Sequence, residues 1–333
     1  MRNIEKPNVF NTLATCVNAN GKIYLSDRRY KALYSIDSLN GDNTFLGKFP
    51  GEDMHTGCCI CGDDILFFSE QNNVDTIDVY SITTNKFSQI KIAKANNRPL
   101  NNRFSSIVTL RNYIYAMPCV SDTFLRIDKD TMDIKTLVLP SNMIDDDIIF
   151  INSIATEDQI FTCERNKPAV YCLTSDNSLE CICKEKASGE LYQKVIEYKG
   201  TLYLIPRKIG GTWYEIEKSS GRSKKFHLGI NNSDDYYAYN ILDNHIWAMP
   251  FSSRYAYSVD LDSLEVSETE ICWSDERNLG YWGAVSMQDS LLFYTAEGNA
   301  PFLKVNKHGG WNEIGAIRNA MDLEVLFSIM GVN

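Results

Sequence analysis

The sequence predicts an all-β protein, a seven-bladed β-propeller whose blades are four-stranded antiparallel sheets. Three observations carry this prediction: an apolar run that recurs seven times, a second apolar run after each copy of the first, and turn-forming residues between the strands. A repeat of roughly 40–50 residues that holds four short strands is the sequence signature of a propeller blade.

The first run is a short apolar segment that ends in a polar residue or proline, as in KIYLSD and TLYLIP. Its first aliphatic residue recurs every 42 to 49 residues, at Ile23, Ile65, Ile114, Ile160, Leu202, Ile246 and Leu291. The second run has a central aromatic residue or leucine, at Tyr34, Tyr80, Leu125, Tyr171, Tyr214, Tyr257 and Leu303. Seven matches in each of two registers predict seven equivalent units, and we expect the aliphatic residues of the first run to be buried.

Two further strands complete each unit. A β-rich segment such as KVIEY precedes the first run, and a weaker outer strand such as KFSQI follows the second. Turns such as NANG and YKG supply the backbone conformations that short hairpins need. We expect one domain over residues 1–333, with blades at 13–50, 55–92, 104–139, 150–184, 192–229, 236–271 and 281–315. Residues 316–333 would be a closing segment, with Val325–Met330 as the strand that latches the ends.

The repeat resembles a degenerate kelch unit, in which a strand of the form IYxxGG is followed by vyxiD and an outer aromatic strand. In this chain Met117-Pro118, Ile205-Pro206 and Met249-Pro250 stand where kelch units carry a glycine pair. The resemblance covers nearly the whole chain and implies the propeller fold. Kelch-like propellers range from protein-binding adaptors to sugar epimerases and copper oxidases, so the resemblance does not select a function.

Charge and hydropathy exclude several partners. The net charge of −10 disfavours non-specific binding to nucleic acid or to an anionic membrane. No stretch approaches the roughly 18–20 apolar residues of a membrane span, and the first residues lack the apolar run of a secretory signal. We therefore expect a cytoplasmic protein with neither nucleic-acid nor membrane partners.

Ten cysteines are present: Cys16, Cys58, Cys59, Cys61, Cys119, Cys163, Cys172, Cys181, Cys183 and Cys272. Most of them lie in apolar strand-like runs, where a cysteine packs as a small hydrophobic residue. Their spacing differs from the two Cys-x2–4-Cys pairs of structural zinc sites. We expect reduced thiols, no metal and no cofactor.

The ligand site is expected at one end of the blades. We call this end the loop face: it carries the loops between second and third strands and the blade-to-blade connections. The opposite end, the hairpin face, carries the turns between first and second and between third and fourth strands, which read as short solvated hairpins. Long loops on a rigid scaffold usually carry function.

An arginine-containing column lies on the predicted loop face. The residue directly after each second strand is Arg28, Glu70, Cys119, Arg165, Arg207, Phe251 or Ala296. Arg254 lies in the same class of loop as this column, and Arg103 lies in a blade-to-blade loop of the same face. Arginine offers a planar fork for carboxylate or phosphate, so Arg28, Arg165 and Arg207 predict an anion site if they converge. The alternative is that each arginine pairs with a nearby acid, such as Asp27 or Glu164.

A second column is mostly aromatic. The residue ten positions before each first-run aliphatic residue is Leu13, His55, Phe104, Phe150, Tyr192, Tyr236 or Tyr281, and Tyr237 and Trp282 follow the last two. These rings either line a pocket that stacks on sugar or heterocyclic rings or wedge between blades. His55 is the one histidine at a position suited to an active site. Our predicted ligand set is Arg28, Arg165, Arg207, Arg254, Arg103, His55, Tyr237, Tyr281 and Trp282.

Three functions remain open on the sequence. The first is binding of a small acidic molecule, such as an acidic sugar, on the loop face. The second is a carbohydrate lyase or epimerase that uses a tyrosine or His55 as base and arginines to neutralise a carboxylate. The third is a scaffold for a protein partner. No catalytic residue is assigned.

Overall fold

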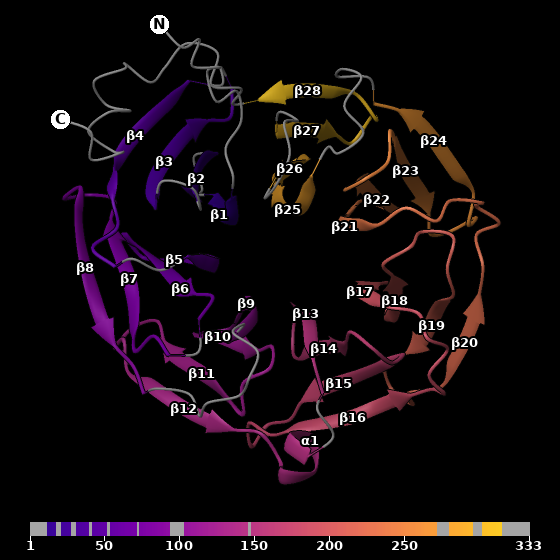
Figure 1. The fold of residues 1–333 in the computed structure, drawn as a ribbon, viewed down its shortest axis with the longest axis horizontal. Coiled ribbons are helices and arrows are strands. Elements are labelled where there is room, and N and C mark those ends of the chain that lie inside the picture. Colours follow the sequence, from indigo (N-terminus) through magenta and orange to yellow (C-terminus); the bar gives the residue numbers. More distant parts are fainter. Residues whose placement is uncertain are drawn as a thin grey trace, which may run out of the picture. The chain divides into compact units, whose positions relative to one another are not determined.

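Strands dominate the computed structural model, which describes residues 12–17, 21–27, 31–39, 42–51, 54–71, 73–93, 103–145, 148–271, 280–295 and 302–314. Within these ranges there are 28 strands and one short helix. Each set of four consecutive strands forms one sheet whose strand order follows the chain, and neighbouring strands such as β1 and β2 or β7 and β8 pair in antiparallel fashion. This arrangement confirms the predicted fold class, a seven-bladed β-propeller (Figure 1).

Blades 1 to 3 are bounded as follows. Blade 1 holds β1 (Thr12–Val17), β2 (Lys22–Asp27), β3 (Ala32–Asp37) and β4 (Asn43–Lys48). Blade 2 holds β5 (His55–Cys61), β6 (Asp64–Ser69), β7 (Thr76–Ser81) and β8 (Lys86–Lys91). Blade 3 holds β9 (Phe104–Leu110), β10 (Tyr113–Pro118), β11 (Thr123–Asp128) and β12 (Ile134–Val138), and the helix α1 (Ser141–Asp145) follows it.

Blades 4 to 7 repeat the same order. Blade 4 holds β13 (Phe150–Ala155), β14 (Ile160–Glu164), β15 (Ala169–Leu173) and β16 (Leu179–Lys184). Blade 5 holds β17 (Tyr192–Tyr198), β18 (Thr201–Pro206), β19 (Trp213–Glu217) and β20 (Ser223–Phe226). Blade 6 holds β21 (Tyr236–Leu242), β22 (His245–Pro250), β23 (Tyr255–Asp260) and β24 (Val266–Glu270). Blade 7 holds β25 (Tyr281–Met287), β26 (Ser290–Thr295), β27 (Phe302–Asn306) and β28 (Trp311–Ile314).

The chain groups into two compact units. One covers residues 53–235 and 261–266 and contains blades 2 to 5; the other contains blade 1, blade 7 and most of blade 6. In the first unit β5, β9, β13 and β17 contact one another in sequence, and in the second β25 contacts both β1 and β21. Neighbouring sheets within a unit therefore meet through their first strands.

Burial follows the strand number within a blade. The seven first-run aliphatic residues are all 0 % exposed, as predicted: Ile23, Ile65, Ile114, Ile160, Leu202, Ile246 and Leu291. They lie in second strands, which are covered on both faces and therefore read as continuous apolar runs. Fourth strands such as β8 and β24 are largely exposed. Burying one such aliphatic side chain contributes about 1.5–3 kcal/mol, so the second strands carry much of the core.

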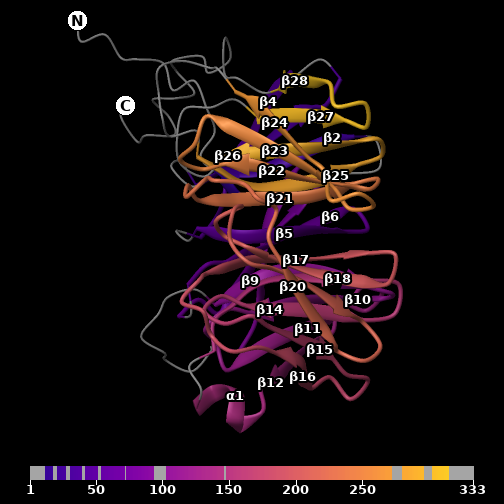
Figure 2. The same cartoon turned by 90° about the vertical axis from the view of Figure 1, so that its right-hand side faces the viewer.

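The helix α1 closes the outer side of one sheet interface. It lies beside β12 and β16 in both views (Figures 1 and 2). Its Met143 is buried in a cluster with Leu139 and Ile148 and with residues of blades 3 and 4. The α1 segment therefore extends the core between these two sheets.

A β-bulge recurs at the second residue of every first strand. The residue left out of the pairing register is Leu13, Thr56, Ser105, Ile151, Gln193, Tyr237 or Trp282. A bulge re-aims the side chain of the extra residue. Consequently Tyr236 and Tyr281 are buried while their neighbours Tyr237 and Trp282 are only partly buried. In blade 1 the register places Thr12 in the aromatic column and Leu13 in the bulge, which corrects the sequence alignment by one residue.

The pairing of the third strand of blade 2 also changes the alignment of the seven repeats. Tyr34 pairs with Leu25, two residues after the buried Ile23. The equivalent pairing in blade 2 joins Phe67 to Asp78, whereas Tyr80 pairs with Ile65. Side chains on a strand repeat with period two, so a slip of two residues keeps Tyr80 on the expected face and is invisible in the pattern. Asp78 is the true structural equivalent of Tyr34.

Three predictions concern residues outside those that the structure describes: the closing strand Val325–Met330, Arg28 and the reduced thiol of Cys272. No helix in the described part of the chain has the length and apolar character of a membrane span.

Candidate functional site

The arginine column is fixed by backbone hydrogen bonds that join successive blades. The Arg165 N–H donates to Ile149 O at 2.8 Å, and Arg165 O accepts from the Tyr192 N–H of the next blade at 2.8 Å. Cys119 repeats this arrangement, accepting from Phe150 N at 3.0 Å. In the described part of blades 2 to 5, Glu70, Cys119, Arg165 and Arg207 therefore occupy positions that are equivalent in space as well as in sequence, at the loop face.

Arg165 and Arg207 occupy the same column position in adjacent blades, 4 and 5. Burial lowers the pKa of Arg207, the Asp235 carboxylate raises it, and the positive charge of Arg165 lowers it further. The Arg207 Nε lies 3.5 Å from Asp235 Oδ2, an ion pair too long for a good hydrogen bond. The Asp235 carboxylate therefore offsets part of the positive charge that Arg165 and Arg207 bring to this face.

A cavity of about 430 Å³ adjoins Arg207 at the loop face of blade 5. Lys208, Glu190, Asn232 and Asp235 contribute polar groups to its lining. Its size falls within the usual range of small-molecule sites, roughly 300–1,000 Å³.

Local backbone contacts shape this cavity. A Cβ on Gly210 would lie 2.3 Å from Ile230 O, so only glycine lets the loop approach the connection to blade 6 so closely. Lys208 forms an isolated β-bridge with Asp235. Glu190 accepts from the Thr212 N–H at 3.2 Å, which holds its carboxylate against the loop. The walls of the cavity are therefore held by hydrogen bonds.

The other predicted arginines have different roles. Arg103 is fully buried and donates from Nη1 to Val74 O at 2.6 Å and from Nη2 to Ala93 O at 2.5 Å. Burial lowers its pKa to about 10. Arg103 thus ties two loops of blade 2 to blade 3, and we leave it out of the ligand site. Arg254 is partly buried and lies on the other unit, where its carbonyl accepts from the Ile271 N–H at 2.7 Å.

The aromatic column packs inside the protein. His55, Phe104, Phe150, Tyr192, Tyr236 and Tyr281 are all buried, which favours the wedge interpretation over the pocket interpretation. The predicted site residue Tyr281 therefore lies in the core. Tyr237 and Trp282 do reach the surface: their rings stack at 4.7 Å with planes 15° apart, and Phe251 packs edge-on to Tyr237 at 4.8 Å. Phe251, which the sequence places in the arginine column, thus belongs to an aromatic trio that the sequence did not reveal.

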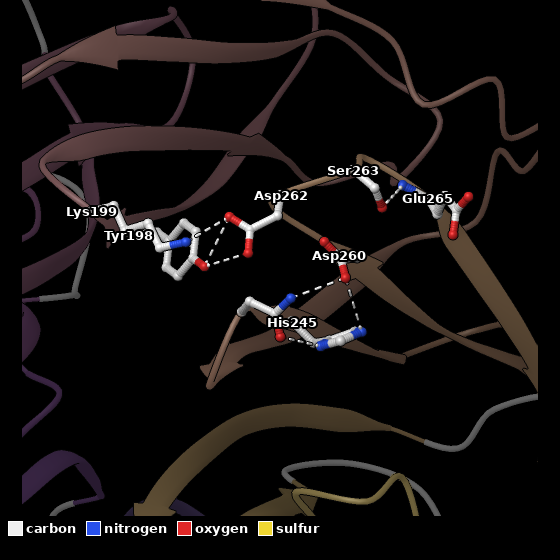
Figure 3. Close-up of polar contacts among 8 residues, drawn as sticks. Tyr198, Lys199, His245, Asp260, Asp262, Ser263 and Glu265 are labelled. Atoms are coloured by element: carbon white, nitrogen blue, oxygen red, sulfur yellow. Dashed lines mark hydrogen bonds and ion pairs between the residues drawn. The ribbon is translucent and has the colours of Figure 1, made fainter.

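His55 is held inside blade 2. Its Nε2 lies 3.0 Å from Asp78 Oδ2, and Asp78 Oδ1 accepts from Gln89 Nε2 at 2.8 Å. The ring is buried, so we leave His55 out of the ligand site. A second histidine, His245, lies on the hairpin face, where its Nδ1 is 2.8 Å from Asn244 Oδ1 and its Nε2 is 3.7 Å from Asp260 Oδ2 (Figure 3).

Ion pairs tie other hairpin turns together. Lys199 Nζ lies 2.8 Å from Asp262 Oδ1, and the Tyr198 hydroxyl donates to the same carboxylate at 3.0 Å (Figure 3). Both residues of the ion pair are more than half exposed. Such exposed pairs contribute little stability. The hairpin face also holds a cavity of about 770 Å³ between blades 3, 4 and 5, which the sequence analysis did not anticipate.

The thiols pack as hydrophobic residues. Cys61, Cys119, Cys163, Cys172 and Cys183 are buried thiols, and Cys181 is exposed. Burial raises the pKa of Cys119 and of Cys163 to about 12, so neither is a thiolate at neutral pH. In the described ranges no group of three or more His, Cys, Asp and Glu side chains is arranged to hold a metal ion.

No protein-family model and no curated protein sequence matches this chain. Solved structures do match. Virginiamycin B lyase from Staphylococcus aureus shares 14 % identity at a TM-score of 0.68, with 86 % of this chain and 92 % of that chain covered. YCF48 from Cyanidioschyzon merolae shares 9 % identity at a TM-score of 0.68, covering 91 % and 98 %. A chain of the mitotic checkpoint complex shares 10 % identity at a TM-score of 0.64, covering 90 % of each chain.

At these identities the likeness shows the fold alone. The matched proteins have different names and different settings, as expected for a fold that hosts many functions. The kelch-like character of the repeat stays a resemblance. The chain is thus a seven-bladed propeller with a small cavity beside Arg207 of blade 5.

Proposed function

We propose that this propeller binds a small carboxylate-bearing molecule, such as an acidic sugar, at the loop face of blade 5. The observation that carries the proposal is a cavity of about 430 Å³ lined by Arg207 and Lys208, with Arg165 at the position equivalent to Arg207 in the adjacent blade. A carboxylate in this cavity offsets these positive charges and accepts paired hydrogen bonds from a planar fork.

The charges around the cavity favour an anion. Two cations, Arg207 and Lys208, and two carboxylates, Glu190 and Asp235, line the cavity. Arg165 of the adjacent blade adds a cation outside this lining, in a chain whose net charge is −10. A local positive region in an acidic protein concentrates anionic ligands. Asn232 and Ser233 in the lining offer hydrogen-bond partners for hydroxyl groups.

Glucuronate and glucose test this proposal, because they share one ring and differ in the carboxylate. Glucuronate should raise the melting temperature of the wild-type protein by mass action, and glucose should not. Arg207→Gln should weaken glucuronate binding about 10- to 100-fold, the cost of one charge-assisted hydrogen-bond partner. Arg222→Gln is the matched control, since Arg222 is exposed in the β19–β20 turn at the other end of the same blade. An equal response to glucose, or unchanged glucuronate binding in Arg207→Gln, would contradict the proposal.

Protein binding is the second candidate, and one observation favours it. Tyr237, Phe251 and Trp282 form a partly exposed aromatic trio on blades 6 and 7. Aromatic residues are enriched in protein interfaces, and one of the similar solved chains belongs to a protein assembly. If the trio binds a partner, Trp282→Ala should abolish co-purification of that partner while the melting temperature and glucuronate binding stay close to wild type. A partner retained by Trp282→Ala would exclude this surface.

A further inference from the structure

We propose that the hairpin face of blades 3 to 5 holds a second ligand site, where Arg111 and Arg126 bind one anionic group, carboxylate or phosphate, carried on a sugar ring. The cavity of about 770 Å³ lies among the turns that join β9 to β10, β13 to β14, β15 to β16 and β19 to β20. It lies at the opposite end of the blades from the Arg207 cavity and shares no lining residue with it.

Arg126 is held in place without a carboxylate. Its guanidinium lies over the Tyr113 ring at 4.6 Å, and its Nη1 donates to Asn177 Oδ1 at 3.3 Å. Among the described residues neither Arg126 nor Arg111 forms an ion pair. A guanidinium ordered by a ring face and an amide loses little further freedom when it meets an anion.

The two arginines line one cavity together with Tyr115. Burial raises the pKa of Tyr115, and the positive charges of Arg126 and Arg111 both oppose that rise. Two cations in one cavity repel each other, and a bound anion lowers that cost.

Asn177 supplies an oriented donor. Its Oδ1 accepts from both the Tyr115 hydroxyl and Arg126 Nη1, each at 3.3 Å. Because Oδ1 receives two donors, the Nδ2 amide is the remaining polar end of the side chain, and in the described structure it has no hydrogen-bond partner. The backbone holds this orientation: Asn177 has a φ of 65°, and its N–H donates to Thr174 O at 3.0 Å. A ligand hydroxyl is a suitable acceptor for this amide.

The far wall limits the ligand to one anionic group. Lys218 Nζ lies 3.4 Å from Asp158 Oδ1, so that wall carries a neutral pair. Glu180 adds an exposed carboxylate to the lining. An acidic peptide would bring its further carboxylates against Asp158 and Glu180. A ring with one anionic substituent keeps its charge at Arg111 and Arg126 and places hydroxyl groups toward Gln159, Ser175 and Asn177.

Glucose, glucuronate and glucose 6-phosphate form the test series, since they share a ring and differ at carbon 6. Titration calorimetry in the Arg207→Gln background measures the hairpin site while the loop-face site is weakened. Glucuronate or glucose 6-phosphate should bind more tightly than glucose, and the tighter of the two identifies the anionic group. Adding Arg126→Gln should weaken that binding about 10- to 100-fold, and Arg111→Gln should weaken it less. Lys91→Gln removes an exposed charge at the end of β8 in blade 2, away from this cavity, and should leave that binding unchanged.

A fold control separates binding from structure. Arg126→Lys keeps the charge but removes the planar fork, so it should keep the wild-type melting temperature and still weaken anion binding. Equal affinity for glucose and both anions would overturn the proposal, as would unchanged anion affinity in Arg126→Gln. Failure of the loop-face site leaves this result intact, because Arg207→Gln is present throughout.

Discussion

Blade 2 differs from blades 4, 5 and 6 at one equivalent pair of positions. In those three blades the first residue of the first strand meets an aromatic residue of the third strand: Phe150 with Tyr171 at 5.3 Å, Tyr192 with Tyr214 at 6.0 Å, and Tyr236 with Tyr257 at 5.8 Å. In blade 2 the same positions hold His55 and Asp78, whose Nε2 and Oδ2 atoms lie 3.0 Å apart.

The comparison shows what the blade architecture requires at this point. An aromatic pair contributes about 0.5–1.5 kcal/mol beyond its buried area. A buried polar pair gains little net stability unless its other groups are hydrogen-bonded. In blade 2 Gln89 donates to the second Asp78 oxygen, and the His55 ring packs against Phe67 at 5.3 Å. At this position the first and third strands therefore need a close-packed contact whose polar groups are hydrogen-bonded. Either an aromatic pair or a His–Asp pair meets this need.

Removing one partner of the polar pair should have the largest effect. Asp78→Ala leaves His55 buried beside a cavity without its carboxylate, and we expect a loss of about 3–5 kcal/mol in the free energy of unfolding. Urea denaturation measures this loss. Asp63→Ala is the matched control, because Asp63 is exposed in the β5–β6 turn. A loss no larger than that of the control would show that the pair is not held as the structure has it.

Converting blade 2 to the chemistry of its neighbours should have a smaller effect of opposite sign. The double variant His55→Phe with Asp78→Tyr recreates the pair that blades 4 to 6 contain. Replacement of a buried ion pair by well-packed groups is neutral or stabilising by about 1–4 kcal/mol. The same urea measurement applies, and each single variant should be less stable than the double variant. A double variant as unstable as Asp78→Ala would mean that the surroundings of this pair in blade 2 are not equivalent to those in blades 4 to 6.

The fold could be predicted from the sequence because the burial of second strands shows in the residues of each strand itself. Continuous apolar runs such as those of β14 and β18 are visible without any contact information. The sequence alignment put Tyr80 where the structure has Asp78, because a shift of two residues along a strand leaves every side chain on the same face of the sheet. The loop between the second and third strands sets that register, and its length varies from blade to blade.

The candidate site could be predicted only in part. The column that contains Arg165 and Arg207 follows from the strand ends, and the backbone hydrogen bonds between blades explain its regularity. Side-chain direction does not follow from the sequence: Arg103 turns inward to two carbonyl groups. The hairpin-face site was missed because Arg126 and Asn177 are separated by 51 residues and meet only when blades 3 and 4 pack together.

In blade 4, a buried glutamate makes the stability of the protein depend on pH. Glu164 ends β14 and is 1 % exposed, and its carboxylate accepts from the hydroxyl of Tyr171, the aromatic partner of Phe150, at 3.3 Å. Burial raises the pKa of Glu164, and Lys167, whose Nζ lies 3.7 Å away, only partly opposes that rise. Blade 4 therefore also buries a carboxylate, but in a setting that favours its protonated form.

A raised pKa in the folded state fixes the sign of the effect. The stability that protonated Glu164 contributes is present below its unfolded pKa, about 4.3, and is lost as the pH rises through its folded pKa. Glu164→Gln keeps the size of the side chain and removes this titration. The variant should therefore match wild type in acid and be slightly more stable near neutral pH, the smallest effect of the three. Urea denaturation at several pH values measures the difference, and a variant that loses stability relative to wild type as the pH rises would show that the ionised carboxylate is the favoured form in blade 4.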